Sequence, residues 1–141
     1  MLKVMFVLFI LSSVGLAQTS SDGSFSVHHV KDASYSFRPT QMREAESIYH
    51  SACAAVQREF HSGASEVRPH FTVVIGAERN ELHSKRAHGG EIRMKNWDSI
   101  VFAQGVVVLA FDHMLTQDVI VQLTNRALRQ ADATVDVAGL K

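Results

Sequence analysis

Histidine is the residue type in this sequence that could most readily support chemistry, because imidazole binds metal ions and transfers protons near neutral pH. The chain contains eight histidines. His83 and His88 are the candidate metal ligands, since Glu78, Glu81 and Glu91 lie close to them in the sequence. Nitrogen and carboxylate ligands of this kind can hold zinc, but the spacing matches no closed zinc motif. A solvated polar loop is the preferred interpretation, and zinc is the alternative.

The other histidines are not spaced to share a ligand. His28 and His29 are adjacent, so on a strand their rings point to opposite faces. His50 and His61 fall on one predicted helix, three turns and about 16 Å apart. His113 follows an aspartate at an expected helix end, where a protonated ring would suit the helix dipole. We expect none of these histidines to form a metal site.

Patterns that indicate a nucleophile or a phosphate site are also absent. The sequence has no Gly-x-Ser-x-Gly elbow, and Gly89-Gly90 is not followed by the Lys-Ser/Thr pair of a phosphate loop. Cys53, the single cysteine, falls beside the apolar stripe of a predicted helix and is expected to be a buried, inert thiol. We therefore expect no catalytic residue and no cofactor, and an enzyme is the less favoured interpretation.

The first seventeen residues are typical of a secretory signal peptide. Lys3 precedes an apolar run over 4–11, and Gly15 and Ala17 supply small residues at positions −3 and −1 to a cut before Gln18. The run is shorter than the about 20 apolar residues that span a bilayer. The sequence predicts a secreted or periplasmic protein, cleaved near Ala17–Gln18 and not attached to a membrane afterwards.

Composition narrows the classes of partner. The chain has 14 basic and 14 acidic residues and a formal net charge of zero. A nucleic-acid binder normally carries a basic stripe, so this balance argues against nucleic acid as a partner. One cysteine cannot form a disulfide scaffold, so the core must hold the fold. Residues 18–24 are expected to be a flexible N-terminus, and 25–141 a single domain.

Hydrophobic patterning predicts the element order β-α-β-(β)-β-α-α. Strands are expected over 25–30 and 71–75, near Leu82, and over 91–95, and helices over 40–61, over 100–111 and after Thr116. The segment 91–95 alternates, which favours an antiparallel or edge strand. The run 100–111 is ambiguous: valine enrichment favours a strand, whereas its length and the preceding Asp98 favour a buried helix, which we choose. The residues after 132 are expected to be extended. The fold class is α+β, with a small mixed or antiparallel sheet and about three helices on one side.

Residues 90–115, GEIRMKNWDSIVFAQGVVVLAFDHML, follow a long helix and a buried strand in an order that resembles the minimal core of gluzincin-type zinc metallopeptidases. The likeness covers about residues 25 to 132, and it concerns element order alone. The resemblance implies a helix that bears HExxH after an edge strand. Gln104, Gly105 and Val108 stand at those positions, and they cannot bind zinc and accept a proton as that motif does. The resemblance therefore implies either a metal-free relative or a likeness of architecture alone, and no catalytic residue is carried over.

Three functional hypotheses follow. The leading one is a small exported, non-catalytic domain that acts as a binding or structural module. The second is a metal-dependent hydrolase that uses the histidines of the 78–91 loop. The third is a subunit that pairs with a protein partner through an exposed edge strand over Glu91–Lys95.

Overall fold

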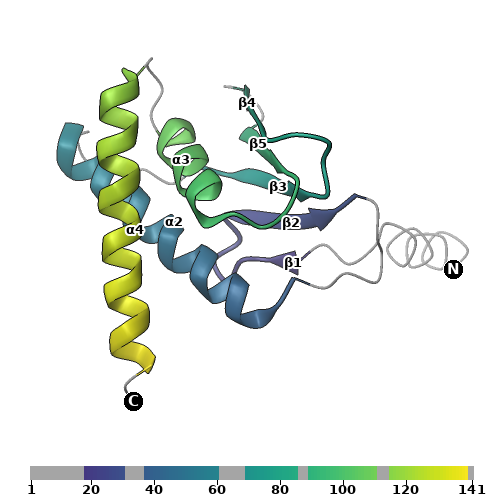
Figure 1. The fold of residues 1–141 in the computed structure, drawn as a ribbon, viewed down its shortest axis with the longest axis horizontal. Coiled ribbons are helices and arrows are strands. Elements are labelled where there is room, and N and C mark those ends of the chain that lie inside the picture. The colour runs from purple at the N-terminus through teal and green to yellow at the C-terminus, as the bar shows by residue number, and fades with distance from the viewer. Residues whose placement is uncertain (1–17, 31–36, 61–68, 86–88, 111–114, 140–141) are drawn as a thin grey trace, which may run out of the picture.

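The computed structural model describes residues 18–30, 37–60, 69–85, 89–110 and 115–139 (Figure 1). His61, His88 and His113 lie outside these residues, as does the predicted signal peptide. The elements are β1 (Gln18–Thr19), β2 (Phe25–His29), α2 (Pro39–Phe60), β3 (Phe71–Ile75), β4 (Glu81–Lys85), β5 (Gly89–Met94), α3 (Ser99–Leu109) and α4 (Gln117–Gly139). The α+β class and the order of elements are confirmed, with the short β1 added.

The sheet is mixed, and its strand order is β1-β2-β3-β5-β4. Strands β2, β3 and β5 run parallel, while β1 and β4 are antiparallel to their neighbours. The segment 91–95, expected to be an antiparallel or an edge strand, pairs antiparallel with β4, but it is not at the edge, because β5 lies between β3 and β4. Apolar and charged residues alternate along β5 because the helices pack on one face of the sheet and not on the other. The edge strand on this side is β4.

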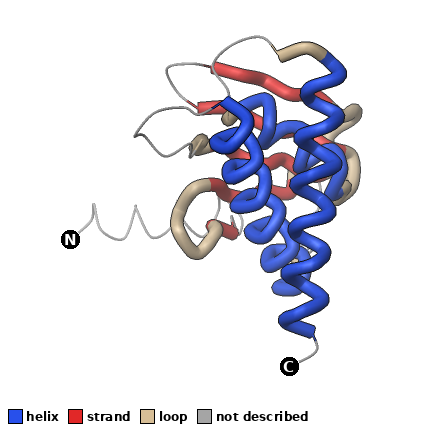
Figure 2. Tube along the Cα trace, turned by 90° about the vertical axis from the view of Figure 1, so that its left-hand side faces the viewer, coloured by secondary structure: helices blue, strands red, loops and turns tan. Residues whose placement is uncertain are grey.

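The three described helices pack on one face of the sheet (Figures 1 and 2). Alternate strand residues point into the core between sheet and helices, among them Phe25, Val27, Val73 and Ile92. This burial of one residue in two is what a sheet with one covered face requires. The prediction of helices on one side of a small sheet is therefore confirmed.

The apolar segment predicted as a helix over 100–111 forms α3 (Ser99–Leu109), and Phe111 lies outside the described residues. Asp98 caps α3, since its Oδ1 accepts hydrogen bonds from the backbone N–H groups of Ile100 (2.9 Å) and Val101 (3.2 Å). Phe102 lies against Phe25 and Phe71, with ring centroids 5.3 and 5.9 Å away. A helix that is apolar on nearly every side is stable because the sheet and two other helices surround it.

Helices α2 and α4 cover α3 and each other. The predicted stripe of α2 is buried at Ala45, Tyr49, Ala52 and Val56. Helix α4 begins after Thr116, whose hydroxyl oxygen accepts the N–H of Val119 (3.4 Å). The expectation of an extended tail is wrong, because α4 continues to Gly139. The tail follows more than four turns of amphipathic helix, so its valines continue the helix and do not start a strand.

The segment 18–24 begins with the short strand β1, which is followed by a turn. Gln18 and Thr19 pair with Val27 and Ser26, and the turn that follows is held by Asp22. Hydrogen bonds from the Ser24 backbone and from the Ser20 hydroxyl keep the pKa of Asp22 low, although burial acts in the opposite direction.

Across the described residues, no helix combines the length and apolar character that a membrane crossing demands.

Candidate functional site

The face of the sheet opposite the helices, which we call the open face, carries most of the polar strand residues. The strand register sets two rows across it: Ser26, Thr72, Glu91 and His83 in one, and His28, Val74, Arg93 and Glu81 in the other. Apart from Val74, these side chains are half-buried or exposed. None of the described helices packs on them, so the open face and the adjoining edge are the surfaces available to a ligand.

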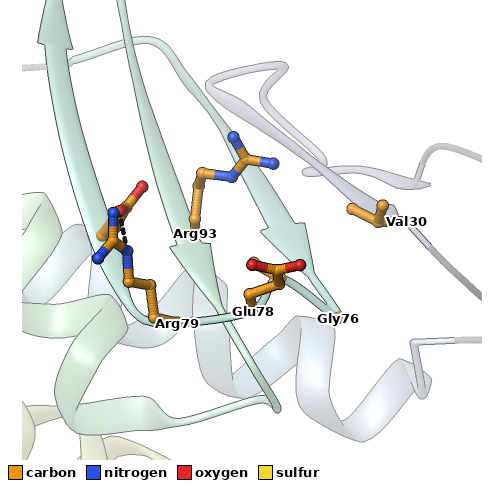
Figure 3. A pocket seen from close by; sticks show the side chains of 7 residues that line it. Val30, Gly76, Glu78, Arg79 and Arg93 are labelled. Atoms are coloured by element: carbon orange, nitrogen blue, oxygen red, sulfur yellow. Dashed lines mark hydrogen bonds and ion pairs between the residues drawn. The ribbon is translucent and has the colours of Figure 1, made fainter.

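A pocket of about 330 Å³ lies at the carboxyl end of the parallel strands, where open α/β sheets commonly bind ligands. It is lined by Val30, Gly76, Ala77, Glu78, Arg79, Glu81 and Arg93. Figure 3 shows Arg93 rising from β5 between Arg79 on one side and Val30 on the other.

Backbone hydrogen bonds join Gly76, which lines this pocket, to the end of β5. Gly76, at φ +91°, donates its N–H to the carbonyl oxygens of Met94 (3.0 Å) and Lys95 (3.2 Å). Asn80 Oδ1 accepts the N–H of Lys95 (3.1 Å), which ties the loop between β3 and β4 to the end of β5. The loop is thus fixed at both ends, and it places Arg79 and Glu81 at the start of β4.

Most of the charged side chains in and beside the pocket form ion pairs. Glu81 Oε1 contacts Arg79 Nε, and Glu81 Oε2 lies 3.1 Å from His83 Nε2. Hydrogen bonds from His83 and Arg79 lower the pKa of Glu81. Arg93 Nε lies 3.5 Å from Glu91 Oε1. A ligand in the pocket would therefore have to complement both signs of charge.

The structure describes only one of the two candidate metal-ligating histidines. His83 is on the open face, paired with Glu81 rather than grouped with other ligands, and His88 lies outside the described residues. His28 points to the open face beside Ser26 Oγ (3.4 Å), while His29 packs against Gly76 on the opposite side. Among the described residues, no three His, Cys, Asp or Glu side chains come together as a metal site.

The helix positions that would carry a metallopeptidase motif do not fit zinc. Val108 offers no ligand atom, and Gln104 is half-buried. At Gly105 a Cβ would lie 2.6 Å from Ile92 Cδ1, so no carboxylate-bearing side chain has room there. The chemistry of the residues present thus leaves this helix without a metal ligand set.

Backbone hydrogen bonds show which groups of β5 face β3. The Gly90 N–H donates to the carbonyl oxygen of His70 (3.4 Å), just before β3, and the Met94 carbonyl accepts from Gly76 (3.0 Å), just after it. Because successive residues of a strand direct their backbone groups to alternate sides, the odd-numbered residues of β5 direct theirs to β4.

The same register determines which backbone groups of β4 face outward. Glu91 and Arg93 stand opposite His83 and Glu81, so these two residues of β4 bond to β5. Leu82 and Ser84 therefore point their N–H and C=O groups away from the sheet. In the part of the chain that the structure describes, no strand pairs with this side of β4. We call this row of outward groups the β4 edge; sequence patterning missed it because Leu82 gave only a weak strand signal.

An apolar surface adjoins the β4 edge. The side chain of Leu82 is 37% exposed, although it lies on the helix side of the sheet beside buried Ile92. Val101, Gln104 and Val108 of α3 are all half-buried, and we call them the α3 flank. Phe102 points toward β2 and β3, and Gly105 lies on Ile92 of β5. Continuing in the same sense around the helix leads to the α3 flank, which therefore lies on the side of β4.

Searches with family models, against curated proteins and against solved structures each found no match to this chain.

Proposed function

We propose that this chain is an exported, non-catalytic binding module that takes an extended segment of a protein partner against the β4 edge. The observation that carries the proposal is the outward direction of the backbone N–H and C=O groups of Leu82 and Ser84. A strand added there gains main-chain hydrogen bonds, and the side chains beside it set specificity.

The composition of β4 supports this role. Natural proteins usually protect an edge with very short strands, proline, bulges or charged side chains, lysine above all. Of these devices β4 carries the charges of Glu81 and Lys85, which a partner strand must match. Strand β4 is five residues long, pairs in continuous register with β5 and contains no proline. Leu82 adds an exposed apolar side chain next to the outward groups. The edge is thus suited to accept a strand.

The non-catalytic part of the proposal is supported by the chemistry of α3. The positions that resemble the gluzincin motif hold Gln104, Gly105 and Val108, and Ile92 fills the space at Gly105. We propose that the domain is a metal-free relative of that fold, or shares only its element order.

A metal-dependent hydrolase is the competing proposal, because His83 Nε2 and Glu81 Oε2 lie 3.1 Å apart and are both donors that zinc accepts. Metal analysis of the purified protein separates the two. We expect no stoichiometric zinc and no cleavage of peptide substrates. One zinc per chain that is lost in His83→Ala would promote the hydrolase.

The edge itself is tested with peptides selected from a phage library of random twelve-residue sequences. Ser84→Pro removes one outward N–H, and an edge strand tolerates proline where its N–H faces solvent. Ser84→Ala removes only the hydroxyl and is the matched control. Selected peptides should bind Ser84→Ala like the parent protein and Ser84→Pro at least about tenfold more weakly, as measured by biolayer interferometry.

Circular dichroism and urea unfolding establish that Ser84→Pro keeps the fold. Peptides that bind folded Ser84→Pro as tightly as the parent protein would place the binding surface elsewhere. If the parent protein is monomeric, a library that yields no binder sensitive to this proline would likewise contradict the β4 edge.

A further inference from the structure

We infer that the segment which the β4 edge accepts belongs to a second copy of this chain, so that two β4 strands pair antiparallel about a two-fold axis at His83. The inference rests on the proposed function and names its partner. It joins two five-stranded sheets into one continuous sheet, with the helices of both copies on the same side.

The backbone directions allow this register. With His83 opposite His83 of the second copy, Leu82 stands opposite the second Ser84, and Ser84 opposite the second Leu82. These are the residues whose N–H and C=O groups point outward. Each such pair exchanges two hydrogen bonds, so every outward group of β4 finds a partner.

The charges of β4 favour the same register. Glu81 of one copy stands opposite Lys85 of the other, and the symmetry repeats this pair. Opposite charges in directly facing cross-strand positions are stabilising, and like charges are destabilising. Moving the axis to Leu82 would instead set Lys85 opposite Arg79. The sequence Glu-Leu-His-Ser-Lys is therefore self-complementary only with His83 at the centre.

Apolar contacts on the helix side support the pairing. The two Leu82 side chains become diagonal neighbours about 7–8 Å apart, within reach of each other. The two β5 strands, each beneath its own α3, lie three strand spacings or about 14 Å apart. The α3 flanks therefore face one another across the paired Leu82 side chains. This covers the exposed leucine and the uncovered side of an otherwise buried helix.

Cysteine cross-linking tests the register. At the axis, the two Cα atoms of position 83 form a non-hydrogen-bonded pair about 4.5 Å apart, within the range of a disulfide. The two copies of position 81 are four residues out of register, about 13 Å apart along the strand. Both variants are made with Cys53→Ala, so that the introduced thiol is the only one. Under mild oxidation His83→Cys should form a disulfide dimer, and Glu81→Cys should not.

Equal cross-linking of the two variants would reject the register, since it would report random collision. No cross-linking of His83→Cys would reject the dimer. Folding of each variant is checked by circular dichroism before oxidation.

Charge exchange gives a second measurement on the protein without added cysteines. Glu81→Lys places like charges together at both ends of the pairing and should weaken the dimer about tenfold by analytical ultracentrifugation. The double variant Glu81→Lys, Lys85→Glu restores opposite signs and should regain most of that loss. A double variant as weak as the single one would contradict the Glu81–Lys85 pairing.

Ultracentrifugation of Ser84→Pro and Ser84→Ala separates this inference from the proposed function. We expect a monomer for Ser84→Pro and a dimer for Ser84→Ala. A parent protein that is monomeric at every concentration, yet binds selected peptides in a manner abolished by Ser84→Pro, would overturn the dimer and leave the β4 edge in place. A monomer that binds no such peptide would overturn both.

Discussion

Gly105 of α3 packs directly on Ile92 of β5. A Cβ at Gly105 would lie 2.6 Å from Ile92 Cδ1 and 2.9 Å from Cγ1, both closer than side chains approach. Ile92 is only 1% exposed and stands in the middle of the sheet, so its side chain has little freedom to move away. The glycine sets the distance between helix and sheet, and with it the position of the α3 flank beside β4.

The first prediction is that Gly105→Ala destabilises the protein. Alanine improves intrinsic helix propensity by about 1 kcal/mol, so without packing the change would be favourable. The overlap with Ile92 outweighs this gain, and overpacking of a buried contact costs about 1–3 kcal/mol. Urea unfolding should show a net loss for Gly105→Ala and a larger loss for Gly105→Leu.

Ile92→Val is the control for this contact because it removes Cδ1. The two substitutions should couple: Gly105→Ala should cost less in the Ile92→Val protein than in the parent, as seen in a double-mutant cycle. Equal costs in both proteins would mean that the destabilisation arises elsewhere.

The second prediction concerns Tyr49, which lies in the core and donates its hydroxyl to the carbonyl oxygen of Pro69 (2.9 Å). Burial raises the pKa of Tyr49 from 10.0 to about 12. Because the pKa of Tyr49 is higher in the folded than in the unfolded state, folding favours the protonated phenol. This contribution to the free energy of unfolding is complete below pH 10, where both states are protonated, and it is lost as the pH rises toward 12. Stability should therefore fall across this interval.

Absorbance at 295 nm checks the assignment. The chain has two tyrosines, so titration of the native protein should include a late step that disappears in Tyr49→Phe. The same variant should lose about 1 kcal/mol near neutral pH, through the missing hydrogen bond. A late step that persists in Tyr49→Phe would assign it to the other tyrosine.

The third prediction is that the thiol of Cys53 reacts slowly in the native protein. Cys53 lies on α2 and is 8% exposed, so a thiol reagent reaches it mainly after unfolding. The variant Val121→Cys, made with Cys53→Ala, provides an exposed reference thiol on the same fold, since Val121 is 46% exposed. If native Cys53 were labelled as fast as that introduced thiol, or if the parent protein formed a reducible dimer, the Cys53 thiol would be accessible.

Sequence patterns correctly predicted the features that depend on residues close together in the chain. Asp98 and the length of the apolar run after it favoured the helix that α3 forms, and the β-branched run 71–75 predicted the buried strand β3. The alternation of Ile92 and Met94 with charged residues also gave the correct packed face of β5. Each of these depends on side chains within a few residues of each other.

Strand neighbours could not be predicted in the same way. An alternating strand with one open face has the same pattern in the middle of a mixed sheet as at its edge, so the sequence assigned the edge to Glu91–Lys95 instead of Glu81–Lys85. The outward direction of Leu82 and Ser84 depends on how β5 pairs with β3, which is a long-range register. The candidate edge was therefore visible only once the strand order was known.

The last prediction concerns export. Lys3, the apolar run over 4–11 and the small residues Gly15 and Ala17 predict cleavage before Gln18. Such a cut would leave β1 intact: Gln18 pairs with Val27 and donates its side-chain Nε2–H to the Phe37 carbonyl oxygen (2.9 Å). Mass spectrometry of protein from the extracytoplasmic fraction should find a chain that starts at Gln18. Replacing Ala17 with a bulky residue should impair this cleavage, whereas the same change at Ser12 should not. Recovery of an uncut chain in the membrane fraction of the parent protein would show that the segment is not a cleaved signal peptide.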